Sequence, residues 1–379
     1  MQTIKSRFVT WFSLIALCLI LSSCFISLEG PGDVPPDPPA QRIDLSGELP
    51  TATPSSQGFD EERLSKGLLE VGNRFYMRSM LIVRNGHLVA EEYFNGTHKD
   101  SLNPLRGATN IITSALIGIA IDEGFIKNEF EPLINFITDI DSAKRDITIQ
   151  NLLTMTSGIR WDESTGGDFG DWLDSGDHLN YVLNRPLAEP PGHRFQYNSA
   201  GVHLLSLVIA EATGMSLLDF ADENLFKPLG ITSRKWEVDS SGFPFAGHGL
   251  HLRPIDLAKL GVLILQDGMS GDTELVSSDW LGKSVRTQFH LGDIHSNLQL
   301  NYGYLWWVES KQSNEVWLAW GNGGQFIYCM PDRNLVIVTT TALASLPRQE
   351  ALARERTLFS LIAEYVLPAV FRRANAAAN

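Results

Sequence analysis

Short apolar runs and alternating apolar and polar residues occur near both ends of the globular part of the chain, and they predict strands. Met80–Phe94 predicts a hairpin, because two apolar runs flank Asn85-Gly86, the pair preferred in tight two-residue turns. Three more strands are predicted over Glu315–Trp320, Gln325–Met330 and Asn334–Thr341. These runs therefore indicate a sheet assembled from both ends of the chain.

The residues between these strands show apolar spacing near 3.6, which predicts helices. The expected helices span Ile149–Thr156, Ala200–Thr213, Ser216–Phe226 and Pro254–Asp267, with a further one from about Arg348 to Val370 after the last strand. This order predicts an α+β fold. An antiparallel sheet from the N- and C-terminal strands is flanked by helices and carries an inserted, mostly helical subdomain of about residues 126–291.

The first residues have the features of an export signal. Lys5 and Arg7 form a short basic region, Val9–Leu21 is mostly apolar, and Leu-Ser-Ser precedes Cys24. We expect residues 1–23 to be a lipoprotein signal peptide, cleaved before Cys24, whose thiol is then lipidated. A plain secretory signal and an uncleaved anchor are the alternatives. The expected location is the bacterial cell envelope, lipid-anchored, and Phe25 after the cysteine favours the outer membrane.

A proline-rich segment follows the signal. Seven of the 18 prolines lie between residues 27 and 58. A segment of this composition buries too little apolar surface to compensate for the entropy lost when it becomes ordered. We therefore expect residues 24–58 to be a tether. The domain is expected to span residues 59–379, with Asp60 capping a helix that contains Leu64.

Composition and charge restrict the classes of function. The chain has 379 residues, 44% of them hydrophobic, which is enough for a large core. Loss of the signal removes two basic residues and no acidic one, so the formal charge goes from −14 to −16, which argues against nucleic acid as a partner. Only Cys329 would remain unlipidated, and cysteine–histidine metal spacing is absent. No disulfide, metal or cofactor is expected, and we expect a monomer.

Four stretches together carry a family resemblance. Residues 106–110 read Arg-Gly-Ala-Thr-Asn at the start of an apolar helix, and 147–159 include Leu-Leu-Thr-Met-Thr-Ser-Gly. Residues 225–231 and 249–261 provide two more landmarks. The combination, over roughly residues 60–370, strongly resembles the serine beta-lactamase and penicillin-binding protein superfamily, in its class C beta-lactamase-related, esterase-like branch. The resemblance implies an active site between the sheet and the helical part.

In that family a serine and, three residues later, a lysine supply the nucleophile and the base of acyl transfer. Here Gly107 and Asn110 occupy the two positions. Glycine has no group that could attack, and an amide accepts no proton near neutral pH. Thr109 points away on the helix, and Ser114 lies about 10 Å deeper. We therefore interpret the site as a degenerate descendant of a catalytic one.

Two further motifs resemble the family's site. Tyr197 and Ser199 match its Tyr-x-Asn or Tyr-x-Ser motif, so Tyr197 takes the place of the proton-transferring tyrosine. Without a lysine nearby, Tyr197 should remain a neutral phenol that forms a hydrogen-bonding wall rather than a base. The second motif matches the substrate-binding strand and comprises Gly321, Asn322, Gly323 and Gln325. A backbone N–H near Gln325 would face an oxyanion. A simple glycine-rich turn is the alternative.

Two other segments leave their roles open. The loop Trp161–Asp177 carries six acidic residues and should cover the rim of the cleft, where a solvated loop is favoured over a site that attracts a cationic ligand. Trp306-Trp307 is favoured as core over a ligand-binding surface.

Three functions are compatible with these residues. The favoured one is an inactive, lipid-anchored protein whose cleft binds a peptide-like, cell-wall or ester ligand, or a protein partner. The second is a hydrolase of esters, amides or beta-lactams with a rerouted mechanism. The third is a structural envelope lipoprotein.

Overall fold

The structure analysed is a computed structural model that describes residues 42–163, 167–295, 298–311, 314–343 and 347–370. The predicted signal peptide, Cys24 and residues 25–41 lie outside the described residues. Their roles stay predictions.

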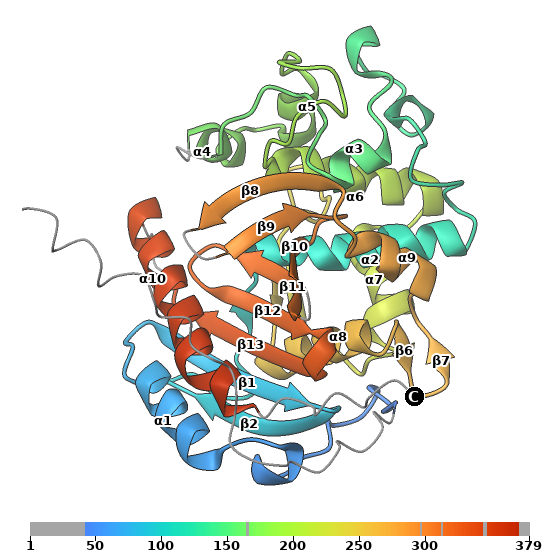
Figure 1. The fold of residues 1–379 in the computed structure, drawn as a ribbon. Coiled ribbons are helices and arrows are strands. Elements are labelled where there is room, and N and C mark those ends of the chain that lie inside the picture. Colours follow the sequence, from blue (N-terminus) through green and yellow to red (C-terminus); the bar gives the residue numbers. More distant parts are fainter. Residues whose placement is uncertain (1–41, 164–166, 296–297, 312–313, 344–346, 371–379) are drawn as a thin grey trace, which may run out of the picture.

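An eight-stranded antiparallel sheet forms the centre of the molecule (Figure 1). Its strand order is β2-β1-β13-β12-β11-β10-β9-β8, so strands from the two ends of the chain lie side by side. The strands are β1 (Met77–Arg84), β2 (His87–Tyr93), β8 (Phe289–His295), β9 (Leu298–Tyr302), β10 (Trp307–Lys311), β11 (Asn314–Gly321), β12 (Gln325–Met330) and β13 (Leu335–Thr341). The predicted α+β fold is confirmed.

Five of these strands match the sequence prediction, and three were missed. Asn85 and Gly86 form the turn between β1 and β2 with φ of 51° and 78°, as their preference for tight turns indicates. The predicted helical part was extended to residue 291, but β8 already begins at Phe289. Strands β8, β9 and β10 extend the sheet beside the helical part. The last helix of the inserted part therefore ends at Ser284, before the predicted boundary.

One face of the sheet is covered by the N- and C-terminal helices. Helix α1 (Glu61–Gly72) begins at Asp60, whose side chain accepts a hydrogen bond from the Arg63 N–H, as predicted. Helix α10 (Arg348–Leu361) continues through a π turn (Ile362–Val366) into α11 (Leu367–Ala369). Phe59, Leu64, Leu358 and Phe326 belong to the core between these helices and the sheet.

The remaining helices cover the opposite face and build the helical part (Figure 1). They are α2 (Asn110–Asp122), α3 (Ile149–Leu153), α4 (Gly167–Leu173), α5 (His178–Leu183), α6 (Ser199–Thr213), α7 (Leu217–Ala221), α8 (Pro254–Leu265) and α9 (Ser278–Ser284), accompanied by short strands β3 (Asn103–Pro104), β4 (Arg234–Trp236), β5 (Leu250–Leu252), β6 (Met269–Ser270) and β7 (Thr273–Glu274). Among the described residues, no single helix has the length and apolar composition to cross a membrane. Helix α6 and residues 217–226 taken together are long and apolar enough, but the two helices are bent by 77° relative to each other.

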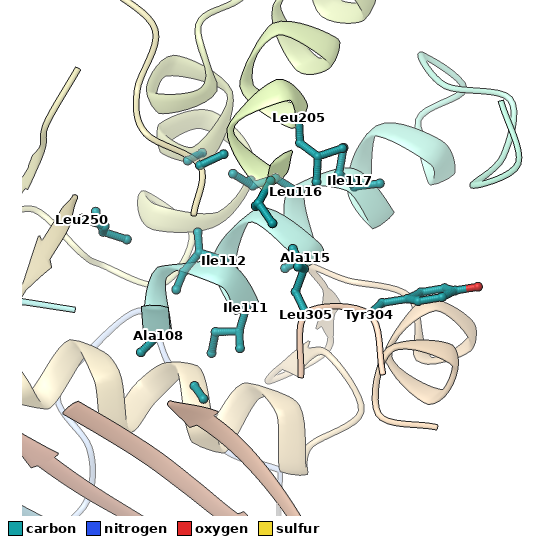
Figure 2. Packing of buried hydrophobic residues seen from close by; sticks show 14 of the residues in the cluster. Ala108, Ile111, Ile112, Ala115, Leu116, Ile117, Leu205, Leu250, Tyr304 and Leu305 are labelled. Atoms are coloured by element: carbon teal, nitrogen blue, oxygen red, sulfur yellow. The ribbon is translucent and has the colours of Figure 1, made fainter. Parts of the chain in front are cut away.

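Helix α2 is buried on all sides. Every residue from Asn110 to Ala120 is buried, and side chains extend from it in different directions toward Leu205 of α6, Leu250 of β5 and the loop at Leu305 (Figure 2). Interiors are closely packed, so such a helix cannot shift without moving its neighbours. The residues at its first turn are therefore held on a rigid support.

The globular domain begins earlier than residue 59. Residues 42–52, here called the strap, pack against the domain instead of forming part of a tether. Leu45 is fully buried, and its N–H donates to Ser270 Oγ at 2.9 Å. The Leu88 N–H donates to the Pro50 carbonyl at 2.8 Å. In the strap, burial of apolar side chains and hydrogen bonds of the backbone compensate for the entropy lost on ordering. The proline content of the segment did not indicate these contacts.

Candidate functional site

The two degenerate positions lie on a short 3-10 turn, Arg106–Thr109, that leads into α2. Residues i and i+3 of such a turn point the same way, so Gly107 and Asn110 face the same region. Arg106 adopts φ of 51°, a left-handed conformation that costs energy for a residue with a side chain. The turn packs against the end of β11.

The space for a side chain at position 107 is filled by two neighbours. A Cβ atom on Gly107 would lie 2.7 Å from Tyr197 Oη and 2.8 Å from the Trp320 carbonyl oxygen. Both distances are shorter than van der Waals contact. A serine at this position would therefore require the tyrosine and the strand end to move, and glycine fits without such a change.

Asn110 completes this arrangement from the next turn. Its side chain is 2% exposed, and Nδ2 donates a hydrogen bond to Tyr197 Oη at 3.0 Å. The amide thus acts as a donor, whereas acyl transfer needs a proton acceptor at this position. The structure brings Gly107, Asn110 and Tyr197 together, as the resemblance implied.

Tyr197 is a neutral phenol in this environment. Burial raises the pKa of Tyr197 well above its usual value, and the negative charge of Glu163 raises it further. Hydrogen bonds with Asn110 and Ser199 offset only part of this pKa shift. A phenol with a raised pKa can donate a hydrogen bond, but it is a poor general base.

The site contains a carboxylate that the sequence interpretation did not predict. Glu163 Oε1 accepts from Ser199 Oγ at 2.7 Å, and Oε2 accepts from the Ser199 N–H at 2.9 Å and from Trp161 Nε1 at 3.0 Å. Ser199 opens α6 after the cap Asn198, and a helix N-terminus favours an anion. Burial raises the pKa of Glu163 above its ordinary value.

A sequence signal for this residue did exist. Glu163 follows the Thr-Ser-Gly landmark by only five positions, whereas the composition of the loop predicts a solvated rim. Two other acidic residues of that loop also form specific contacts. Asp168 pairs with Arg185 at 2.6 Å, and Asp177 caps α5 through the Asn180 N–H.

The glycine-rich segment is the turn between β11 and β12. Gly321 pairs with Gln325 across the hairpin, and Gly323 and Gly324 adopt φ of 87° and 105°. The Gly323 N–H donates to Glu355 Oε1 of α10 at 2.6 Å, and burial raises the pKa of Glu355 to about 7. Both glycines are needed, because residues with side chains rarely adopt these conformations.

The predicted members of this segment lie in different places. The Gly321 Cα lies 3.9 Å from the Cβ position at Gly107, and Asn322 is exposed. Gln325 is buried, and its Nε2 donates to Thr341 Oγ1 at 2.6 Å, so this side chain points into the sheet. The Gln325 side chain is therefore structural in this conformation, and the oxyanion role expected of a backbone N–H near this residue stays a prediction.

Aromatic rings line the site beside Tyr197. The Trp307 ring stacks on the Tyr197 ring with centroids 5.9 Å apart and planes 15° apart, and the Trp320 ring lies 5.3 Å from that of Trp307. All three side chains are half-buried. Trp306, by contrast, is 1% exposed and belongs to the core. The Trp-Trp pair thus divides between core and site.

Neither Thr109 nor Ser114 replaces the missing nucleophile. Thr109 is fully buried, and Ser114 Oγ lies 3.4 Å from Ser284 Oγ of α9, deep in the helical part. Within the described part of the chain, the groups at the site therefore include a phenol, an amide, a carboxylate with the Ser199 hydroxyl that donates to it, and aromatic rings.

Comparison with known proteins identifies the family of the chain. Residues 77–360 match the family described as Beta-lactamase. The chain is 23% identical over 281 residues to the 6-aminohexanoate-dimer hydrolase of Paenarthrobacter ureafaciens, covering 69% of this chain and 71% of that protein.

Solved structures show the same fold. A candidate 6-aminohexanoate-dimer hydrolase from Bacillus anthracis has a TM-score of 0.69 at 20% identity, covering 86% of this chain and 90% of that one. An octameric penicillin-binding protein homologue from Pyrococcus abyssi has a TM-score of 0.64 at 18% identity, with 81% and 79% covered.

Proposed function

This chain belongs to the Beta-lactamase family, and from that premise we propose that it is an exported, lipid-anchored member that forms no acyl-enzyme. It binds its ligand non-covalently at the site around Gly107 and Tyr197. The ligand is a peptide-like, cell-wall or ester compound, or a protein partner, in keeping with the family resemblance.

One observation supports the proposal that covalent catalysis has been lost. The Tyr197 hydroxyl and the Trp320 carbonyl occupy the space of a side chain at Gly107, and Asn110 donates to that same hydroxyl. Asn110 Nδ2 thus makes its hydrogen bond to the phenol, while Asn110 Oδ1 has no hydrogen-bond partner among the described residues. Covalent catalysis needs an attacking atom with a base in hydrogen-bond reach, and neither position 107 nor position 110 supplies one.

The direct test compares the full chain with a Gly107→Ser/Asn110→Lys variant. Both are treated with a chromogenic beta-lactam, a p-nitrophenyl ester and a fluorescent serine-directed phosphonate. We expect the natural chain to remain unlabelled and to turn over neither substrate. Labelling of the double variant would support a site that has lost only its chemistry.

A matched control separates chemistry from packing. Gly107→Ala/Asn110→Lys introduces the same crowding at position 107 but no hydroxyl, so it should stay unlabelled. Turnover by the natural chain that disappears in Tyr197→Phe would contradict the proposal.

A second candidate function is favoured by one electrostatic interaction. Glu163 lies close enough to Tyr197 to raise its pKa, and a carboxylate with a raised pKa is a better general base near neutral pH. A hydrolase in which water attacks with help from Glu163 is therefore the alternative. It predicts turnover by the natural chain without phosphonate labelling, abolished by Glu163→Gln.

The export part of the proposal has its own test. Cells that express the full chain are grown with radiolabelled palmitate, and we expect the label in the natural protein but not in Cys24→Ser. The protein should fractionate with the outer membrane. A labelled Cys24→Ser variant would contradict lipidation at this cysteine.

A further inference from the structure

Three buried histidines lie together in the helical part of the molecule. They are His178 of α5, His203 of α6 and His248 of the loop before β5. Their rings pack around Trp172 of α4 and around Phe245, with ring centroids between 4.4 and 5.6 Å apart. These five side chains are here called the histidine cluster.

The histidine cluster attaches α4 and α5 to the domain. The two helices have only seven and six residues, and helices of this length are marginal without tertiary contacts. They lie at the end of the helical part away from β1 and β2 (Figure 1). Trp172 is the buried residue of α4, and its Nε1 donates to the His178 carbonyl at 3.0 Å. The position of both helices therefore depends on this cluster.

Helix α4 is connected to the Glu163 carboxylate by direct contacts. The Trp172 ring lies 6.3 Å from the Trp161 ring, at an angle of 82°, and Trp161 Nε1 donates to Glu163 Oε2 at 3.0 Å. The Asp162 N–H donates to Asp168 Oδ2 of α4 at 2.6 Å. A displacement of α4 would therefore loosen the contacts that hold Glu163 at the site.

His203 already has an anionic partner. Its Nε2 lies 3.0 Å from Asp239 Oδ2, and both side chains are fully buried. Asp239 Oδ1 accepts from the Ser241 and Phe243 N–H groups, at 2.8 and 2.9 Å. A carboxylate that accepts from several donors is the ionised form, so His203 Nε2 donates to it. A second proton on His203 would meet a neighbouring negative charge.

His248 has no such partner among the described residues. Its Nδ1 makes no hydrogen bond there, and burial, followed by the neighbouring His203, Arg106 and His178, lowers the pKa of His248 to about 3. The carboxylates on the surrounding elements are paired, cap a helix or are exposed: Asp168, Asp171, Asp174, Asp177, Glu237 and Asp239. A proton on His248 is therefore accommodated only when the cluster opens to water.

We propose that the histidine cluster is an acid-sensitive latch, in which protonation of His248 releases α4 and α5 and opens the site around Glu163 and Tyr197. As a means of regulating ligand binding, the latch rests on the proposed function, whereas the opening itself does not depend on what the site binds.

The size of the effect follows from proton linkage. A solvated imidazole has a pKa near 6.5, whereas the closed form keeps His248 neutral. The closed form is therefore fully favoured above about pH 6.5 and loses about tenfold of its advantage for each pH unit below it. Between pH 7 and pH 4.5 the ratio of open to closed molecules should rise by about a hundredfold.

Hydrogen–deuterium exchange of the full chain at pH 7 and pH 4.5, read by mass spectrometry and corrected for intrinsic exchange rates, measures this opening. We expect the protection of residues 167–183 to fall by about a hundredfold. Residues 110–122 of α2, which are held in the core, should keep their protection at both pH values.

His248→Phe is the informative variant, because phenylalanine keeps an aromatic ring but binds no proton. Residues 167–183 should then stay protected at pH 4.5. His248→Gln removes the titrating group with a smaller side chain and should also remove the pH dependence. His98→Gln is the matched control, since His98 is exposed, and in this variant the opening should persist.

Unchanged protection of residues 167–183 at pH 4.5 in the natural chain would overturn the inference. An equal loss of protection in α2 would overturn it too, because it would indicate global unfolding, as would opening that persists in both His248 variants. The phosphonate and ester assays decide the proposed function separately. A chain that stays unlabelled but does not open at pH 4.5 would keep that function and lose the latch.

Discussion

Replacing Glu355 by glutamine should stabilise the protein more at alkaline than at acidic pH. Glu355 is 2% exposed, and burial raises its pKa from 4.5 to about 7. A carboxyl whose folded-state pKa is raised contributes fully to stability at low pH. That contribution is lost as the pH rises from about 4.5 through 7, because the folded protein must then ionise a buried group.

The size of the effect follows from the pKa shift. Each unit corresponds to about 1.4 kcal/mol, so the penalty grows by about 2–3 kcal/mol between pH 5 and pH 8. Glu355→Gln removes this titration and can still accept from the Gly323 N–H. The unfolding free energy that Glu355→Gln adds should therefore be about 2–3 kcal/mol larger at pH 8 than at pH 5. A weaker hydrogen bond from the Gly323 N–H to the neutral amide would lower both values equally.

Urea unfolding followed by tryptophan fluorescence at the two pH values measures this difference. Glu92→Gln is the control, since it removes an exposed carboxylate and should change stability equally at both pH values. An equal effect of Glu355→Gln at pH 5 and pH 8 would refute the reasoning, because it would mean that the buried carboxyl does not titrate between them.

Three further predictions concern packing and acid stability. Gly107→Ala should cost about 1–3 kcal/mol by overpacking, and less in a Tyr197→Phe background, so that urea midpoints of the two changes are not additive. Burial lowers the pKa of His248 to about 3, so its contribution to stability is present above about pH 6.5 and is lost as the pH falls toward 3. Between pH 7 and pH 4 the natural chain should lose about 3 kcal/mol more than His248→Gln, as measured by urea unfolding. Leu45→Ala should lower the unfolding free energy by about 2–5 kcal/mol, whereas Leu69→Ala, at a side chain 69% exposed, should change it little.

The parts of the fold that could be predicted depend on local chemistry. Asp60 as a helix cap and Asn85-Gly86 as a turn follow from hydrogen bonds and backbone preferences within a few residues, and both are confirmed. Strands β8 to β10 were missed, because apolar and polar residues alternate only weakly along these segments. The strap was missed because the burial of Leu45 depends on residues more than 200 positions away.

The candidate site divides in the same way. The positions of Gly107, Asn110 and Tyr197 relative to one another follow from motif spacing, and the structure agrees with them. Glu163 could not be assigned from spacing alone, since its role depends on a contact with Ser199, 36 residues further along the chain. The filled space at Gly107 likewise depends on the Trp320 carbonyl, which no local pattern specifies.

The strap has a consequence for how the protein behaves in concentrated or membrane-bound form. Strand β2 is one of the two edge strands of the sheet, and the edge of a sheet can pair with a strand of another chain. Thr51 forms a parallel bridge with Leu88, so the strap shields part of this edge by occupying its backbone donor and acceptor. At high local concentration, as the proposed lipid anchoring would create on a membrane, the N-terminal segment of each chain would thus keep this part of the edge from pairing with another chain.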